Sequence, residues 1–361
     1  MPAFAISLFE ILIGILLLFG GGELFVAGSV AISLLFGIPQ IVIGLTVVSL
    51  GTSAPELFVS LLSTIQGGSA GDALAVSNVV GSNIFNVLVV LGASAVVMPL
   101  GVKNRLVRRD LPLLLAVSMA TWGMASGGRL TWVAGLALIT GAVINLLWEL
   151  RSASEQPAAA ADGVDPDGAA TPAVAATKLA IGLVLLIAGS QLLVKGSIAA
   201  AQAMGVSQTV IGLTIVAAGT SMPELITSLV AAYRGNADIA IANVVGSNLL
   251  NQLVILGLCG VVSGGRGLGV DPVMLARDFP IMVATTLVCL PIFWSRGVIS
   301  RLEGALLMGL YLLYLVDQLL GNTAPSMADE FRLVVLVVVL PVALIAVAWG
   351  ALRWYRQQQQ E

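Results

Sequence analysis

The sequence predicts an all-α polytopic membrane protein with two five-helix repeats and an eleventh, C-terminal helix. Three observations predict this class. Hydrophobic residues make up 58% of the 361 residues and charged residues only 10%, too few to cover a water-soluble globule of this size. Apolar runs recur along the whole chain, and two segments of mixed polar and apolar residues each occur twice in the same order.

The apolar runs are long enough to cross a bilayer, whose hydrocarbon core of about 30 Å needs roughly 20 apolar helical residues. Read against polar, glycine and proline breaks, the first set of spans is predicted at 5–31, 40–66, 71–98, 107–126 and 130–150. The second set is predicted at 177–204, 207–233, 236–264, 278–295 and 301–320, and a further span at 332–352.

The chain is therefore expected to have four parts. Residues 1–151 form the first repeat and residues 178–320 the second. Between them, residues 152–177 are rich in Ala, Pro, Gly and Asp without apolar periodicity, which predicts a flexible cytoplasmic linker. Residues 321–361 hold the extra span and a short polar tail.

The loop arginines and lysines predict the orientation. With the N-terminus outside, most of them fall on the inner side, as the positive-inside rule requires. We therefore expect a multi-pass protein of a bacterial inner (plasma) membrane, in contact with the lipid bilayer, with an outer N-terminus and a cytoplasmic C-terminus.

Several kinds of site are excluded by what the chain lacks. It has no histidine, which removes histidine-dependent zinc sites and serine–histidine catalysis. Both cysteines, Cys259 and Cys289, lie in apolar runs and are expected to be buried thiols. No basic tract suggests a nucleic acid partner. We expect no cofactor and no obligate protein partner.

Two segments are duplicated within the chain. Residues 43–61 read IGLTVVSLGTSAPELFVSL and residues 211–229 read IGLTIVAAGTSMPELITSL; residues 78–86 read NVVGSNIFN and residues 243–251 read NVVGSNLLN. Each unit holds five predicted spans, and an odd number makes the second unit enter the membrane from the opposite face. The sequence therefore predicts inverted repeats related by an axis in the membrane plane.

The first duplicated motif runs from Gly51 to Glu56 and from Gly219 to Glu224. Its proline removes an N–H group and its glycine permits non-helical backbone, so each helix should break within the membrane and free carbonyl oxygens. The hydroxyls of Thr52 and Ser53, and their repeats Thr220 and Ser221, add further oxygens.

The second motif supplies Ser82 and Asn86 in one half and Ser247 and Asn251 in the other. Each pair is four residues apart and shares a helix face. Calcium prefers six to eight oxygen ligands, and two glutamates supply the charge that balances one divalent ion. Sodium uses the same oxygens with less charge, so one site could hold either ion in competition, which is the physical basis of antiport.

At these motifs the sequence resembles the sodium/calcium exchanger branch of the calcium/cation antiporter superfamily. The resemblance covers both repeats and implies a ten-helix exchanger core and a secondary transporter rather than an enzyme, with Ca²⁺ and Na⁺ as transported ions. Glu56 and Glu224 would be the principal calcium ligands, joined by backbone carbonyls of Thr52 and Thr220.

The resemblance also implies a set of sodium ligands. These would be Ser53, Ser221, the threonine oxygens, the backbone carbonyls of Ser49 and Ala217, and, at outer sites, Ser82 and Ser247. Asn86 and Asn251 would line the centre. Both are Asn where many relatives have one Asp, which makes potassium co-transport unexpected. Spans 1 and 6, rich in glycine, would slide against the other spans to alternate access.

Three alternatives remain to be weighed. Proton-coupled exchange of calcium or another divalent cation is chemically possible, because a buried glutamate can bind a proton. An intramembrane hydrolase would use Ser53 or Ser221 with Lys195 as base, but the serine motif is duplicated and the lysine is not. A cation channel would show no dependence on a counter-ion.

Overall fold

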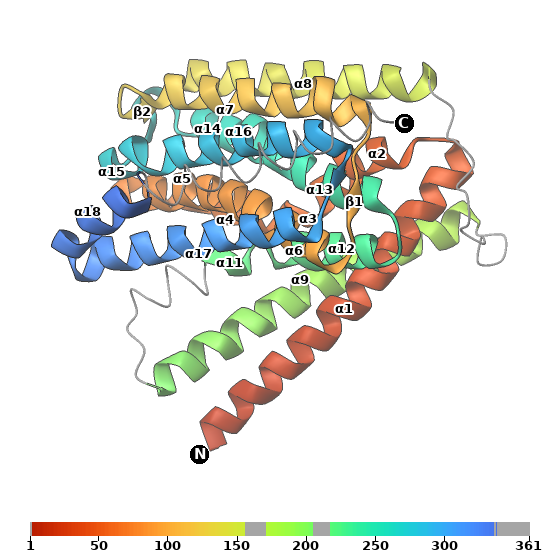
Figure 1. The fold of residues 1–361 in the computed structure, drawn as a ribbon, viewed down its shortest axis with the longest axis horizontal. Coiled ribbons are helices and arrows are strands. Elements are labelled where there is room, and N and C mark those ends of the chain that lie inside the picture. Colours follow the sequence, from red (N-terminus) through yellow and green to blue (C-terminus); the bar gives the residue numbers. More distant parts are fainter. Residues whose placement is uncertain (1, 156–170, 205–216, 336, 338–361) are drawn as a thin grey trace, which may run out of the picture.

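The computed structural model of the protein describes residues 2–155, 171–204, 217–335 and 337, and nearly all of them are helical (Figure 1). The helices of the first half are α1 (Pro2–Phe36), α2 (Gln40–Ile43), α3 (Ser49–Thr52), α4 (Ala54–Gln66), α5 (Gly68–Phe85), α6 (Gly92–Val97), α7 (Leu111–Ala125) and α8 (Trp132–Glu155). Those of the second half are α9 (Pro172–Ala203), α11 (Ala217–Gly219), α12 (Met222–Tyr233), α13 (Ala237–Leu250), α14 (Gly257–Val262), α15 (Pro272–Ala276), α16 (Asp278–Arg296), α17 (Arg301–Thr323) and α18 (Pro325–Val334).

Seven helices of the described part are long and apolar enough to cross a membrane, and the bent pair Gln40–Thr52 and Ala54–Gln66, with an angle of 48°, makes an eighth. The predicted all-α membrane class is thereby confirmed. The predicted span 107–126 corresponds to a π-helical segment η3 (Leu106–Asp110) continued by α7. Of the predicted span 207–233, residues 207–216 lie outside the described residues.

Helix bounds differ from the predicted parts at two places. The predicted linker 152–177 is helical at both ends, since α8 continues to Glu155 and α9 begins at Pro172. Thr171 caps α9 by accepting a hydrogen bond from the Val174 amide, and a proline in the first turn suits a helix start. Most of the predicted span 332–352 lies outside the described residues.

A π-helical segment follows α5 in the first half, and a corresponding one follows α13 in the second half. Segment η2 (Asn86–Leu91) joins α5 to α6, and η5 (Asn251–Leu256) joins α13 to α14. Each begins at the asparagine that ends a duplicated motif. Such segments are rare and occur frequently at functional sites.

Four short strands join loops of the two halves. Strand β1 (Leu100–Gly101) pairs antiparallel with β4 (Val298–Ile299), and β2 (Arg129–Leu130) pairs with β3 (Leu268–Gly269). The Leu-Gly dipeptide of β1 in the first half recurs as β3 in the second half. Each of these two strands pairs with a strand of the opposite half. This reciprocal pairing is what a two-fold relation between the halves produces.

Helices α1 and α9 lie side by side and cross the rest of the bundle obliquely (Figure 1). A Cβ atom added at Gly14 would lie 2.8 Å from the Gly189 carbonyl oxygen, and one added at Gly21 would lie 2.9 Å from that of Gly182. Gly28 meets Ala175 in the same way. The contacts recur every seven residues along antiparallel helices, so the two backbones touch along one continuous seam.

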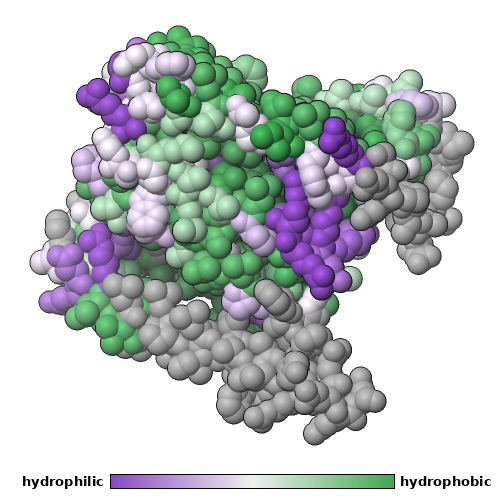
Figure 2. Space-filling model, turned by 90° about the horizontal axis from the view of Figure 1, so that it is seen from above, coloured by the Kyte–Doolittle hydropathy of each residue, from purple (hydrophilic) through white to green (hydrophobic). Residues whose placement is uncertain are grey.

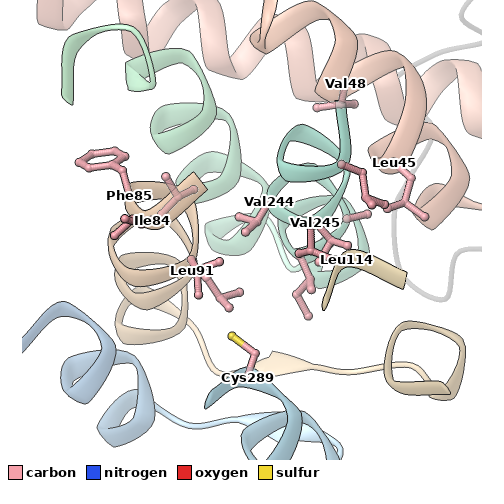
Figure 3. Packing of buried hydrophobic residues seen from close by; sticks show 14 of the residues in the cluster. Leu45, Val48, Ile84, Phe85, Leu91, Leu114, Val244, Val245 and Cys289 are labelled. Atoms are coloured by element: carbon pink, nitrogen blue, oxygen red, sulfur yellow. The ribbon is translucent and has the colours of Figure 1, made fainter. Parts of the chain in front are cut away.

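The core lies where helices of both halves interdigitate. Figure 3 shows Val244 and Val245 of α13 between Leu45 of π-helical segment η1 (Gly44–Val48) and Phe85 of α5. The four side chains are buried. The outer face in Figure 2 is mostly hydrophobic, with hydrophilic side chains gathered in separate patches, as expected for a surface in contact with lipid.

Candidate ion-binding site

The first duplicated motif breaks each helix at its serine. Ser53 has φ −82° and ψ 7°, and Ser221 has φ −89° and ψ 11°, whereas helical geometry resumes at once in α4 and α12. A proline lies in the first turn of each new helix, where its missing N–H costs no hydrogen bond. Glu56 and Glu224 lie in the same first turns, so the positive end of each helix dipole faces a carboxylate.

The two glutamates are buried and each is bonded to the opposite half. Glu56 is 0% exposed and Glu224 is 1% exposed. The Ser221 hydroxyl donates to Glu56 Oε1 at 3.0 Å, and the Ser53 hydroxyl donates to Glu224 Oε1 at 2.9 Å. Ser53 precedes the helix of Glu56 but bonds to Glu224, and Ser221 does the reverse, so the two carboxylates approach each other from opposite halves.

Each carboxylate keeps one oxygen without a hydrogen bond from any residue that the structure describes. These atoms are Glu56 Oε2 and Glu224 Oε2, and both are fully shielded from solvent. A buried carboxylate oxygen without a donor is costly unless a cation or an ordered water meets it. The pair of oxygens is therefore where a cation or an ordered water would bind.

The asparagines that end the second motif bond across the two halves. The Asn86 amide donates to Asn248 Oδ1 and the Asn251 amide donates to Asn83 Oδ1, each at 3.1 Å. Asn86 Oδ1 and Asn251 Oδ1 are buried and, among the described residues, receive no hydrogen bond. Each half therefore has a glutamate and an asparagine that keep one buried acceptor oxygen without a donor in the described part.

The predicted serines lie around this centre. Ser82 Oγ is 3.0 Å from Ser221 Oγ, and Ser247 is fully buried four residues before Asn251 on the same helix face. Ser49 donates to the Gly44 carbonyl at 2.6 Å, inside η1. Ala217 begins α11, and the part of the second half that would mirror η1 lies outside the described residues.

The predicted threonines are held by two residues that motif reading had not assigned a role. The Thr52 hydroxyl donates to Asn243 Oδ1 at 3.1 Å, and the Thr220 hydroxyl donates to Asn78 Oδ1 at 3.2 Å. Asn78 and Asn243 are the first residues of the two NVVGSN segments. Their duplication was the signal, because chance rarely preserves a polar residue at one place in two apolar helices.

The available oxygen ligands suit a hard cation. The unpaired atoms of the two motifs are carboxylate, amide and hydroxyl oxygens, and the described ranges contain no group of three or more Cys, Asp or Glu side chains that could hold a metal ion by themselves. Two carboxylates supply two negative charges, which match one divalent ion. Thiolate and imidazole ligands, which softer metals prefer, are missing from the set.

Two cavities include Thr220 in their lining. A cavity of about 820 Å³ between α4 and α9 is lined by Pro55, Gly219 and Thr220, among others. A second, of about 370 Å³, is lined by Asn78 and Thr220 and extends to Arg277 and Asp278 at the start of α16. On the mirrored side, Thr52 and Asn243 are both 0% exposed.

Other intramembrane charges form ion pairs away from this site. Lys195 pairs with Glu10 at 2.6 Å, between α9 and α1, and Glu23 of α1 pairs with Arg234 at the end of α12. Ser53 and Ser221 bond to carboxylates instead of to Lys195. The chain therefore does not arrange Lys195 as the base of a serine nucleophile.

The chain resembles known proteins in family and in sequence. The family model described as Sodium/calcium exchanger protein matches residues 6–150 and 175–320. The sodium/calcium exchanger MaX1 of Methanosarcina acetivorans is 31% identical over 347 residues, covering 85% of this chain and 96% of that protein. The inner membrane protein YrbG of Escherichia coli is 32% identical over 323 residues, covering 86% and 97% respectively.

The fold was compared with solved structures. The sodium-calcium exchanger NCX_Mj matches with a TM-score of 0.74 and 29% sequence identity, over 87% of this chain and 99% of that one. Crystals of NCX_Mj were soaked with sodium, calcium or strontium, and the likeness is similar in each condition. MaX1 and NCX_Mj are named as sodium/calcium exchangers, which are transporters rather than enzymes.

Proposed function

Because the chain belongs to the sodium/calcium exchanger protein family, we propose that it is a secondary active antiporter that exchanges calcium for sodium across a membrane. One observation carries the proposal. Two buried glutamates from opposite halves each accept a hydrogen bond from the other half's serine, and each leaves one carboxylate oxygen free. Such an arrangement is stabilised by a cation that contacts both halves at once.

Calcium binds between Glu56 and Glu224, which neutralise its charge, with backbone carbonyls of Thr52 and Thr220 as further ligands. Sodium ions use oxygens that carry less charge. Their ligands are the Thr52 and Thr220 oxygens, Ser53, Ser221, Ser82, Ser247 and the carbonyls of Ser49 and Ala217. Asn86 and Asn251 face the centre with free amide oxygens. Both sets of ligands include oxygens of Thr52 and Thr220, and the charge of the two glutamates balances either ion, so full occupancy by one excludes the other.

The core consists of two inverted five-helix repeats. The reciprocal pairing of β1 with β4 and β2 with β3 supports this symmetry, as do the exchanged serine–glutamate bonds. Helices α1 and α9, fixed to each other by their glycine seam, move as one unit against the other helices. Cavities that reach Thr220 while Thr52 is sealed support a state open to one face only.

The protein lies in a bacterial inner membrane with its N-terminus outside. Cysteine labelling tests this orientation, since Cys259 and Cys289 are buried and should not react. With a membrane-impermeant maleimide, Ser126→Cys at the exposed α7–α8 turn should react in intact spheroplasts, and Asn104→Cys, exposed beyond β1, only in inverted vesicles. The opposite pattern would reverse the proposed topology.

Flux measurements in proteoliposomes test the exchange itself. Vesicles loaded with sodium should take up radioactive calcium from sodium-free medium, and uptake should vanish when sodium is equal on both sides. A pH gradient alone should drive no uptake. Uptake driven by the pH gradient would identify proton coupling, and uptake that needs neither gradient would identify a channel.

A further inference from the structure

Asn78 and Asn243 lie outside the predicted ligand set, but each of them bonds to a glutamate, a serine and a threonine. The Asn243 amide nitrogen donates to Ser228 Oγ at 2.9 Å and to the Glu224 carbonyl at 3.3 Å. The Asn78 amide nitrogen donates to Ser60 Oγ at 2.9 Å and to the Glu56 carbonyl at 3.2 Å. With its nitrogen fixed by two acceptors, each amide must turn its oxygen the other way.

Each amide oxygen meets a threonine of the opposite half. Thr52 Oγ1 lies 3.1 Å from Asn243 Oδ1, and Thr220 Oγ1 lies 3.2 Å from Asn78 Oδ1. An amide oxygen only accepts, so the hydroxyl proton must lie along this contact. The lone pairs of the threonine oxygen then remain free for a cation, which never binds the hydrogen side of a hydroxyl.

We infer that Asn78 and Asn243 are positioning residues that aim the threonine hydroxyl lone pairs at the ion and so set the affinity for sodium more than for calcium. The inference rests on the proposed exchange function. Sodium depends on hydroxyl and carbonyl oxygens, whereas calcium depends chiefly on the two carboxylates.

Loss of the asparagine oxygen harms sodium binding in a second way. The Thr52 hydroxyl also lies 3.4 Å from the Ser49 carbonyl, a longer and weaker contact than that to Asn243. Without Asn243 its proton turns to this carbonyl or to the Glu224 carboxylate, which also attracts the Thr52 hydroxyl. Both are proposed ion ligands, so one proton then occupies an oxygen that a bound ion needs.

The variant Asn243→Leu tests the inference in proteoliposomes, because leucine has nearly the same shape as asparagine. Two half-saturation concentrations are measured: that of sodium for driving calcium efflux, and that of calcium for calcium–calcium exchange without sodium. The sodium value should rise about tenfold, as expected when a buried hydrogen bond is lost. The calcium value should change by less than about threefold. Asn78→Leu, at the mirrored position, provides a second test should Asn243→Leu fail to fold.

A double-mutant cycle identifies the partner of each asparagine. Thr52→Val removes the hydroxyl itself and should shift the sodium value at least as much as Asn243→Leu does, and the two together should shift it no further than Thr52→Val alone. Asn243→Leu with Thr220→Val should give additive effects, because Thr220 bonds to Asn78. Thr52→Ser keeps the hydroxyl and should shift the sodium value less than Thr52→Val does.

Two results would overturn the inference: an unchanged sodium value in folded Asn243→Leu, or equal shifts of the sodium and calcium values, which would indicate a purely structural role. Failure of the exchange proposal looks different. In that case the unmodified protein itself shows no sodium-driven calcium flux in the same vesicles.

Discussion

Replacing Glu56 or Glu224 by glutamine is expected to abolish sodium-driven calcium flux, with a loss of at least about a hundredfold in calcium affinity. Glutamine preserves the shape of the side chain and can still accept the serine hydrogen bond at its amide oxygen. It removes one of two charges that face the ion. In a partly desolvated site, a unit charge about 4 Å away contributes several kcal/mol, far more than a neutral oxygen ligand restores.

Calcium binding to purified protein, measured by titration calorimetry in detergent, checks this expectation separately from transport. Glu10→Gln and Glu23→Gln are the matched controls. Both glutamates lie in α1 and form ion pairs away from the site, with Lys195 and Arg234. These variants should bind calcium normally. Retained calcium binding in both Glu56→Gln and Glu224→Gln would mean that the ion sits elsewhere.

The sequence predicted which residue types form the site better than it predicted which of these residues hydrogen-bond to each other. Duplication of Gly-Thr-Ser-x-Pro-Glu located both helix breaks and both carboxylates, because proline and an intramembrane charge have few structural uses. The partners could not be predicted in the same way. That Ser53 bonds to Glu224, and not to Glu56 three residues along its own chain, depends on how the two halves dock.

Helix ends were less predictable than helix positions. The run 152–177 has no apolar periodicity, yet its last residues join α9, since a Thr-Pro pair can start a helix without an apolar face. The short helix α18 was also unexpected. Its Arg332 pairs with Asp317 of α17 at 2.6 Å, a contact that no local pattern encodes.

The glycines of spans 1 and 6 were predicted to let these two spans slide against the others; the seven-residue register that joins α1 to α9 emerges from the structure. Gly21→Ala should lower the thermal stability of the purified protein, whereas the neighbouring Gly20→Ala should leave it unchanged or raise it. An alanine Cβ at Gly21 would lie 2.8 Å from the Leu186 amide nitrogen, but one at Gly20 would meet no atom of a described residue within 4 Å.

Both substitutions gain the same helix propensity, up to about 1 kcal/mol, so the difference between them measures the seam alone. Forcing apart backbones that touch costs about 1 to 3 kcal/mol, enough to lower the unfolding temperature by several degrees in detergent. Gly189→Ala, the equivalent position in the second half, meets the Leu18 amide nitrogen at 2.8 Å and should destabilise equally. Equal unfolding temperatures of the Gly20→Ala and Gly21→Ala variants would show that α1 and α9 separate freely. Two helices that separate freely cannot move as one unit.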